Sequence, residues 1–303
     1  MKLIPNKKRN LYGLLAVSLL LLILAVLLCL WMVQAAIDRP TKDVAAKNSE
    51  GNGIPVPIVM YHGLIKDPSL QNNFFIHPDT FRQDLDYLQA NGYTPVFMDE
   101  LIAYTKGSGA LPLKPIVLTF DDGYYNNYLY AFPILKEKNM KATISILGRY
   151  TDAFSQVDEN NAAYSHITWT QIKEMRNSGL VEIQNHTYNL HTYNQGRKGA
   201  MQNKGESLDA YRWVMVADVG SLQKRISEMT GYTPTTFTYP FGYMGENSDL
   251  IARELGFSAT LGCEEGLNYI TKDPYCLYGL KRVLRPLNSS SEEFFNTFSK
   301  FTP

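Results

Sequence analysis

The first long apolar segment of the chain runs from Leu11 to Val33 and contains no charged residue. As a helix, this segment would be about 35 Å long, which is enough to cross a bilayer. Four cations precede it and charges of both signs follow it, so the positive-inside bias predicts a cytoplasmic N-terminus. We therefore expect a basic cytoplasmic tail at residues 1–10 and one transmembrane helix at residues 11–33. The rest of the chain would lie outside the cell, held at the membrane by this helix.

A secretory signal peptide is the alternative interpretation of the same segment. Val33-Gln34-Ala35 resembles a cleavage site with small residues, and cleavage near Ala35 would release a secreted protein. The apolar run is longer than the usual span of about 7 to 15 residues in signal peptides. Its length therefore favours an anchor.

Beyond residue 33, residues 34–54 are rich in polar and small side chains without apolar periodicity, which predicts a flexible linker. Short apolar runs then alternate with segments of helical spacing, for example Phe81, Leu85 and Leu88 between Pro78 and Gly92. Strands are expected at 58–61, 116–120, 142–147, 180–184 and 280–284 and near Phe237 and Ser258, and further helices at 129–138, 169–177 and 211–229. This alternation predicts an α/β fold with a parallel sheet, open or closed into a barrel, in one domain over residues 55–303.

Composition and charge narrow the class of protein. The chain is 45% hydrophobic and 19% charged, which is typical of a globular protein. Lys plus Arg and Asp plus Glu both total 29, but four cations precede the first acid, Asp38, so the remainder carries a net charge of about −4. A nucleic-acid-binding surface is therefore not expected. Cys263 and Cys276 could form one disulfide in an exported protein or stay unpaired.

Ligands of parallel α/β folds bind beyond the carboxyl ends of the strands. Two long polar connections, at 148–166 and 192–207, are expected to border such a groove.

Two adjacent carboxylates follow the strand expected at 116–120, in the sequence Thr119-Phe120-Asp121-Asp122-Gly123. Gly123 permits a sharp turn there. An Asp-Asp-Gly sequence by itself is also common in ordinary solvated turns. It becomes a candidate site only in combination with other residues.

Two histidines, His186 and His191, follow the strand expected at 180–184. A spacing of five residues turns about 140° around a helix, so a loop has to bring the two rings together. Two imidazoles and a carboxylate would give a divalent metal three protein ligands and leave a position open for water. The pattern therefore predicts a catalytic metal site.

With these motifs, the sequence resembles the polysaccharide deacetylases (NodB-homology domain, carbohydrate esterase family 4). The resemblance covers roughly residues 55–287 and rests on Thr119–Gly123, the histidine pair and Tyr239-Pro240-Phe241-Gly242. It implies a distorted (β/α) barrel that removes N-acetyl groups from amino-sugar polymers with a divalent metal. By position, Asp122, His186 and His191 would bind the metal, and Asp121 would be the general base.

The chemistry of amide hydrolysis fits this assignment. An amide is a poor electrophile, so a metal is needed to activate water and to polarise the acetyl carbonyl. A free carboxylate beside the metal can take the proton of the water, and backbone N–H groups at Tyr239 and Phe241 are the candidates to hold the oxyanion. Zinc is the first expectation for the metal, and cobalt, nickel and iron also suit these ligands.

The sequence departs from the family pattern at three points. The gap between the histidines is one residue longer than usual, as in the branch that acts on poly-N-acetylglucosamine. Thr238 stands where the family has an arginine that orients the base, so this partner is expected to be missing. No histidine follows His191 to act as the usual general acid, and His62, at the end of the first strand, is the candidate replacement.

Three functions stay open at this level. The first is a metal-dependent deacetylase acting on an exopolysaccharide or on peptidoglycan of the cell wall. The second is a glycan-binding module on a deacetylase scaffold, prompted by the missing arginine and late histidine. The third is another metallohydrolase, such as an ester or peptide amidase.

Overall fold

The computed structural model describes residues 53–157, 159–194 and 196–301. The tail expected at residues 1–10, the helix expected at residues 11–33 and all but the last two residues of the expected linker lie outside these ranges. Within the described ranges, no helix is long and apolar enough to cross a membrane.

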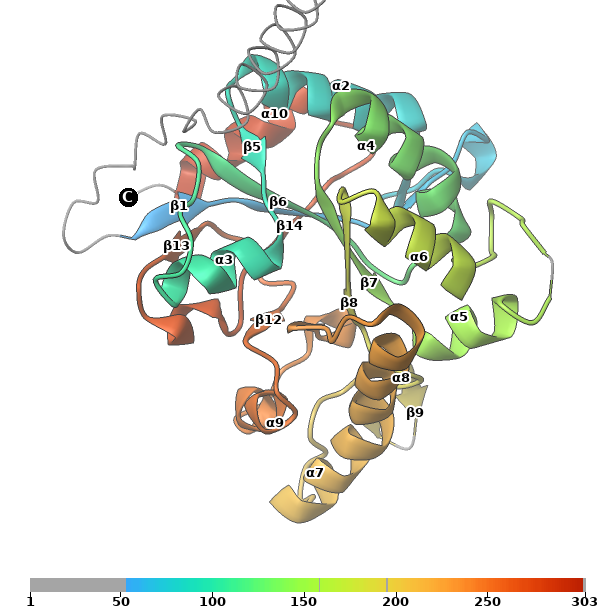
Figure 1. The fold of residues 1–303 in the computed structure, drawn as a ribbon, viewed down its shortest axis with the longest axis vertical. Helices are drawn as coiled ribbons and strands as arrows, with labels where there is room; N and C mark the ends of the chain where they lie inside the picture. Colours follow the sequence, from blue (N-terminus) through green and yellow to red (C-terminus); the bar gives the residue numbers. More distant parts are fainter. Residues whose placement is uncertain (1–52, 158, 195, 302–303) are drawn as a thin grey trace, which may run out of the picture. The chain divides into compact units, whose positions relative to one another are not determined.

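An eight-stranded parallel sheet that curls on itself forms the centre of the described chain (Figure 1). Seven strands follow the order β12-β11-β8-β7-β6-β2-β14, and β5 pairs with the beginning of β6. A parallel bridge between Leu261 and Leu280 connects the β12 edge to the segment that leads into β14. This is the architecture expected of a distorted (β/α) barrel. The strands are β2 (Ile58–Tyr61), β5 (Thr94–Pro95), β6 (Pro115–Phe120), β7 (Ala142–Ile146), β8 (Val181–Asn185), β11 (Thr236–Thr238), β12 (Ala259–Leu261) and β14 (Val283–Leu284).

The strands β2, β6 and β7 are mostly apolar because both of their faces are covered, whereas three of the five residues of β8 are polar. Every residue of β2, β6, β7 and β8 is buried. Strands that are covered on both sides have continuous apolar runs in their sequence, and such runs were the basis for predicting strands. Tyr61, Phe81 and Phe120 pack against one another at the centre of this core.

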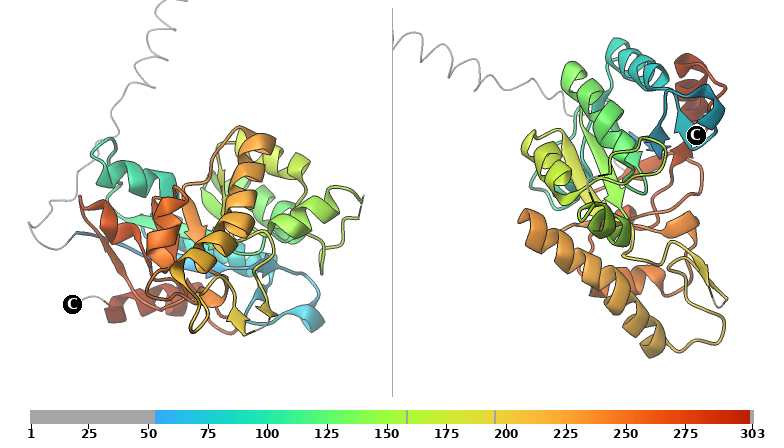
Figure 2. Two further views of the ribbon diagram at one scale, coloured as in Figure 1. Left: turned by 90° about the horizontal axis from the view of Figure 1, so that it is seen from below. Right: turned by 90° about the vertical axis from the view of Figure 1, so that its right-hand side faces the viewer.

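Helices cover the outside of the curled sheet (Figures 1 and 2). Helix α2 (Pro78–Ala90) buries Phe81, Leu85 and Leu88 on one face, as their spacing predicted. Helix α6 (Trp169–Asn177) begins with a capping box between Thr168 and Gln171. The other α-helices are α3 (Met98–Thr105), α4 (Phe132–Lys138), α5 (Gly148–Phe154), α7 (Leu208–Met215), α8 (Ser221–Thr230), α9 (Ser248–Glu254) and α10 (Ser291–Asn296).

Short strand pairs lie beside the main sheet. They are β1 (Ile54–Val56) with β13 (Asn268–Ile270), β3 (Gly63–Leu64) with β4 (Phe75–Ile76), and β9 (Tyr193–Asn194) with β10 (Arg197–Lys198).

The structure corrects the sequence analysis in the two long connections and in one helix. The connection at 148–166 begins with α5, and the connection at 192–207 contains the β9–β10 hairpin. The helix expected at 211–229 begins earlier and is interrupted by a π-helical segment, η3 (Val216–Gly220), between α7 and α8. Cys263 and Cys276 are both free thiols, so the disulfide alternative is wrong in this structure.

Candidate active site

The candidate residues come from the carboxyl ends of neighbouring strands. Asp121 and Asp122 follow β6, His186 follows β8 and His62 follows β2. Parallel strands bring these ends to one edge of the sheet. Asp122 has a φ of 68° and Gly123 a φ of 71°, so the backbone turns sharply directly after the strand. A Cβ atom on Gly123 would lie 3.0 Å from Ile146 Cγ2, so the turn also packs closely on β7.

The structure brings the three predicted metal ligands together. The Nε2 atoms of His186 and His191 each lie 3.6 Å from Oδ1 of Asp122. One ligand atom from each of the three residues lies within 4.8 Å of the others. A tetrahedral ion with bonds of about 2.1 Å separates its ligand atoms by about 3.4 Å, so a small closure of the loop would suffice to bind one.

A hydrogen bond orients the ring of His186, one of the two candidate histidine ligands. Nδ1 of His186 lies 2.7 Å from the carbonyl oxygen of Thr238, and because a carbonyl only accepts, this ring nitrogen carries the proton. Nε2 is then the free lone pair that faces Asp122. Burial lowers the pKa of His186 to about 3 and also lowers the pKa of His191. Both rings are therefore neutral at pH 7, the form that binds metals.

The environment of Asp122 fits a bound cation. Its Oδ1 is buried and has no hydrogen-bond partner among the described residues, which is unusual for a buried carboxylate oxygen. Burial, together with the charge of Asp121, raises the pKa of Asp122 to about 7. A divalent cation among these three residues would supply the missing partner and favour the charged carboxylate.

Asp121 has a different partner, which corrects the expectation that its arginine is missing. Arg282 donates from Nη1 to Oδ1 at 2.7 Å and from Nη2 to Oδ2 at 2.8 Å, so the pair is bidentate. Both side chains are almost completely buried. Arg282 also donates to the carbonyl oxygen of Gly262 and to Thr119 Oγ1. A guanidinium from the residue directly before β14 thus takes the place expected at residue 238.

The ion pair with Arg282 gives Asp121 a different pKa and charge from the adjacent Asp122. Burial alone would raise the pKa of Asp121, but the Arg282 guanidinium outweighs burial and holds this pKa well below its usual range. Asp121 is therefore charged at pH 7 and is not one of the three clustered ligands. This arrangement gives the site an ionised carboxylate directly beside the candidate metal position.

His62 lines the same cavity as the carboxylates and the histidine pair. The cavity has a volume of about 470 Å³. The His62 ring contacts Phe74 edge-on, and its Nδ1 is buried without a hydrogen-bond partner among the described residues. Burial lowers the pKa of His62 to about 4. The cavity is lined by Met60, His62, Phe74, Phe75, Asp121, Asp122, Tyr124, His186, His191, Phe241 and Cys263.

The structure separates the two candidates for the oxyanion site. The N–H of Tyr239 donates to the carbonyl oxygen of Leu261 at 3.0 Å, and its ring is fully buried away from the cavity. The assignment of Tyr239 to the substrate site is therefore wrong, because the β11–β12 pairing already uses its N–H. Phe241 does line the cavity, and its φ of 57° turns the backbone sharply there. Its ring lies 4.2 Å from the His191 ring.

Sequence reasoning missed Arg282. Leu280, Arg282 and Leu284 share one face of the expected last strand, since side chains alternate along a strand. A charged residue on an apolar face needs a buried partner, which is the signal that could have identified it. The pattern does not reveal which acid, 161 positions away in the sequence, is that partner.

Comparisons with known proteins agree with this geometry. A sequence model of the family described as polysaccharide deacetylase matches residues 108–260, half of the chain. The poly-beta-1,6-N-acetyl-D-glucosamine N-deacetylase of Escherichia coli (strain K12) is 27% identical over 254 residues, which cover 78% of this chain. The match spans 37% of the length of that relative.

Solved structures share the fold. A de-N-acetylase from Aggregatibacter actinomycetemcomitans is similar with a TM-score of 0.68 at 25% identity, covering 80% of this chain and 99% of that protein. IcaB from Ammonifex degensii is similar with a TM-score of 0.62 at 28% identity, covering 78% of this chain and 93% of that protein. The family model matches half of the sequence, and these solved structures share its fold. The chain therefore belongs to the polysaccharide deacetylase family.

Proposed function

We propose that this chain is a metal-dependent hydrolase that removes N-acetyl groups from an extracellular polysaccharide containing N-acetylglucosamine. The observation that carries the proposal is the pairing of a charged, arginine-bound Asp121 with the cluster of Asp122, His186 and His191 beside it. The relative from Escherichia coli is named for poly-beta-1,6-N-acetyl-D-glucosamine. An exopolysaccharide of this kind is therefore the preferred substrate, ahead of peptidoglycan.

In this proposal, each residue has one task. Asp122, His186 and His191 would hold the divalent metal, zinc in the first place, which supplies Lewis-acid activation of water and of the acetyl carbonyl. Asp121 takes a proton from the attacking water. The backbone N–H of Phe241 stabilises the negative charge that develops on the carbonyl oxygen.

His62 is the proposed proton donor to the leaving nitrogen. Because its pKa is about 4, the free ring is neutral at pH 7. The proton it donates must therefore reach the ring during the reaction, after Asp121 has taken it from water. Breaking of the C–N bond then releases acetate and leaves a free amine on the sugar.

Aromatic side chains at the cavity suit a sugar polymer. Phe74 is 51% exposed beside His62, and Tyr193 is 62% exposed with its ring 4.5 Å from the Phe241 ring. Flat rings at both sides of the reacting groups offer surfaces on which pyranose rings can pack.

The proposal predicts acetate release from β-1,6-linked N-acetylglucosamine oligomers. A chelator should abolish release and added zinc should restore it, since the metal is needed to activate water. Asp121→Asn should lower kcat at least 1000-fold while zinc still binds, because the substitution leaves the three ligands in place. A parallel assay on peptidoglycan compares the two polymers. Zinc-loaded protein that releases no acetate from either polymer would rule the proposal out.

One of the two arguments for a glycan-binding module without catalytic activity no longer holds. This alternative was prompted partly by a missing arginine, and Arg282 provides the guanidinium that Asp121 needs. Binding of oligomers by wild-type protein without any turnover would nevertheless favour it.

We also propose that residues 11–33 anchor the protein in the cell membrane with the catalytic domain outside. The uncharged 11–33 segment and the cations before it support this orientation. Fractionation with N-terminal sequencing tests it: an anchored chain sediments with membranes and keeps residues 1–33, whereas a secreted chain begins near residue 36.

A further inference from the structure

The loop between His186 and His191 determines where the second histidine lies. Thr187, with a φ of 86°, places a β-branched residue in the left-handed region, an uncommon conformation that neighbouring contacts have to hold. The backbone N–H groups of Gly148 and Arg149 donate to the carbonyl oxygens of Thr187 and Tyr188. These bonds fix the first half of the loop.

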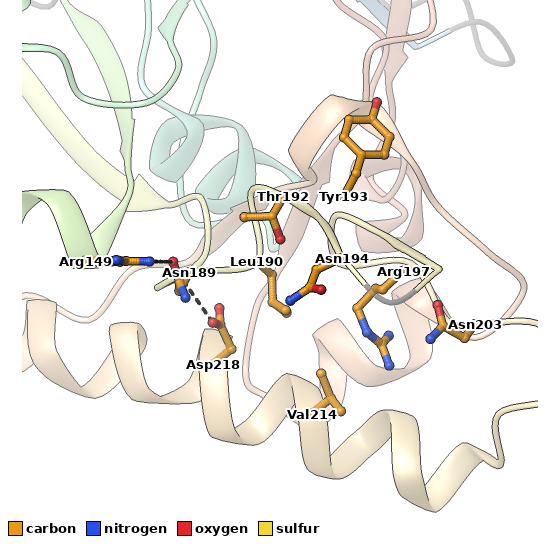
Figure 3. Close-up of a pocket in the computed structure, with 10 residues that line it drawn as sticks. All are labelled: Arg149, Asn189, Leu190, Thr192, Tyr193, Asn194, Arg197, Asn203, Val214 and Asp218. Atoms are coloured by element: carbon orange, nitrogen blue, oxygen red, sulfur yellow. Dashed lines mark hydrogen bonds between the residues drawn. The ribbon is translucent and has the colours of Figure 1, made fainter. Parts of the chain in front are cut away.

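Asp218 holds the second half of the loop, just before His191. Its Oδ1 accepts the N–H of Tyr188 at 2.8 Å, and its Oδ2 accepts the N–H of Asn189 at 2.9 Å. One half-buried side chain thus binds two consecutive backbone amides, and Figure 3 shows it pointing from the helix toward the loop.

The π-helical segment η3 provides this contact and a second one. Asp218 and Val219 both lie in η3, and the Val219 carbonyl oxygen accepts a hydrogen bond from Asn185 Nδ2 at 2.9 Å. Oδ1 of Asn185 in turn accepts the N–H of Thr187 at 2.9 Å. Segment η3 therefore contacts the chain on both sides of His186. Single π-helical turns within α-helices occur frequently at functional sites.

On the side that faces the helix, Leu190 packs against the apolar cluster that contains Tyr211, Met215 and Val219. A cavity of about 590 Å³, distinct from the one at the candidate metal site, lies between the loop and α7, with Leu190, Thr192, Asn194 and Val214 among its lining residues (Figure 3). Beside this cavity and the packing of Leu190, the hydrogen bonds of Asp218 fix the backbone of the loop from the helical side.

We propose that Asp218 is a positioning residue that fixes His191 relative to His186 and so sets the affinity of the site for a divalent cation. The inference rests on the proposed metal-dependent function. Asp218 acts through the loop backbone and touches neither the candidate ligands nor the cavity at His62.

The test is the dissociation constant of zinc, measured on metal-free protein by competition with a chromophoric chelator. Asp218→Ala removes every acceptor and should raise Kd about 10- to 100-fold, the usual effect of losing an outer contact of a metal site. Asp218→Asn keeps one acceptor oxygen and should have a smaller effect. Asp209→Ala is the matched control, because Asp209 is an exposed acid on the adjoining helix α7, and its Kd should stay within twofold of wild type.

Two further readouts separate positioning from a merely structural role. At saturating zinc, Asp218→Ala should regain acetate release, with KM for the oligomer unchanged. A lower Tm of the metal-free variant with an unchanged Kd would overturn the proposal, as would equal Kd values for Asp218→Ala and Asp209→Ala. If Asp218→Ala does not fold, Asp218→Asn gives the same comparison.

Zinc binding is measured without substrate, so the two proposals can fail separately. An unchanged Kd overturns the role of Asp218 alone. Absence of acetate release by zinc-loaded wild-type protein overturns the deacetylase function alone, and a wild-type protein that binds no zinc overturns both.

Discussion

Asp121 and Asp122 are neighbours in the chain, yet their surroundings give them opposite properties. The Arg282 guanidinium reaches both oxygens of Asp121 and lowers its pKa, whereas burial raises the pKa of Asp122 to about 7. One carboxylate is thereby kept charged, and the other forms the candidate cation site with the two histidines. The adjacent acids could be identified from the sequence, but their different roles depend on a contact that only the folded chain makes.

Replacing Arg282 should affect stability and catalysis together. Arg282→Leu leaves a buried carboxylate without its partner and should lower the free energy of unfolding by about 3–5 kcal/mol. The pKa of Asp121 should then rise, and kcat at pH 7 should fall at least 100-fold because the base becomes protonated. Chemical denaturation and acetate release, measured well below Tm, test both effects.

Arg285→Leu is the matched control for this substitution. Arg285 forms an equally buried bidentate pair with Asp84, which lies outside the cavity. It should lose similar stability and keep wild-type kcat while folded. Equal kcat values for the two variants would show that Arg282 has no part in catalysis. If Arg282→Leu does not fold, Arg282→Lys keeps the charge but loses the bidentate geometry and should lower kcat less.

At the scale of elements, the sequence predicted the strands better than the turns. The strand expected at 58–61 matches β2, and the helix expected at 169–177 matches α6, because continuous burial and a capping box leave clear patterns. The helix α5 and the β9–β10 hairpin were missed because they are short and polar. The positive φ in the backbone turn at Phe241 could not be predicted from the sequence, since it depends on close packing against a neighbouring strand end.

This turn yields a prediction about Gly242. Its φ is 70°, and an added Cβ atom would lie 2.5 Å from Cβ and 2.7 Å from the backbone nitrogen of Cys263. Gly242→Ala should therefore displace the turn and Phe241 with it, lowering kcat at least tenfold and the free energy of unfolding by roughly 2–3 kcal/mol.

Gly231→Ala is the comparison. Gly231 ends α8 with the same φ of 70°, but an added Cβ atom would have no neighbour within 4 Å. The Gly231→Ala variant should lose only about 1–2 kcal/mol of its free energy of unfolding, because of the positive φ, and should keep wild-type kcat. If both variants keep wild-type kcat, the position of Phe241 does not matter for the reaction.

At the scale of the whole molecule, the order of the sheet assembles the site from distant parts of the sequence. β2 lies between β6 and β14, so the first and last strands of the sheet are neighbours. Alternating apolar runs predicted a parallel sheet, but they do not specify this order. The cluster of Asp122 and the two histidines could therefore be anticipated from strand ends at one edge of the sheet, although β7 lies between β6 and β8. The contribution of the residue before β14 could not.

Buried histidines make the stability of the metal-free protein depend on pH. His166 stacks on Tyr150 and lies beside Tyr124, and burial lowers its pKa to about 4. Unfolded histidine has a pKa near 6.5, so between these two values the unfolded state binds more protons and stability falls as the pH falls. His166 should contribute a loss of roughly 3 kcal/mol between pH 6.5 and 4.

His166→Phe tests this contribution, because it keeps an aromatic ring in the stack and removes the titrating group. Urea denaturation in the presence of a chelator, from pH 7 to 4, should show a shallower decline for the variant than for wild type. Parallel curves would mean that His166 is not the group responsible.

The position of Arg282 also has a consequence for biosynthesis. Every other proposed catalytic group precedes it by more than 40 positions, so a ribosome translates the base, the metal ligands and the proton donor well before the guanidinium that tunes the base. A nascent chain halted after Lys281 would carry Asp121 without its counter-ion. Under the proposed function, hydrolysis therefore requires that the final strand has been translated and has docked beside the first strand of the sheet.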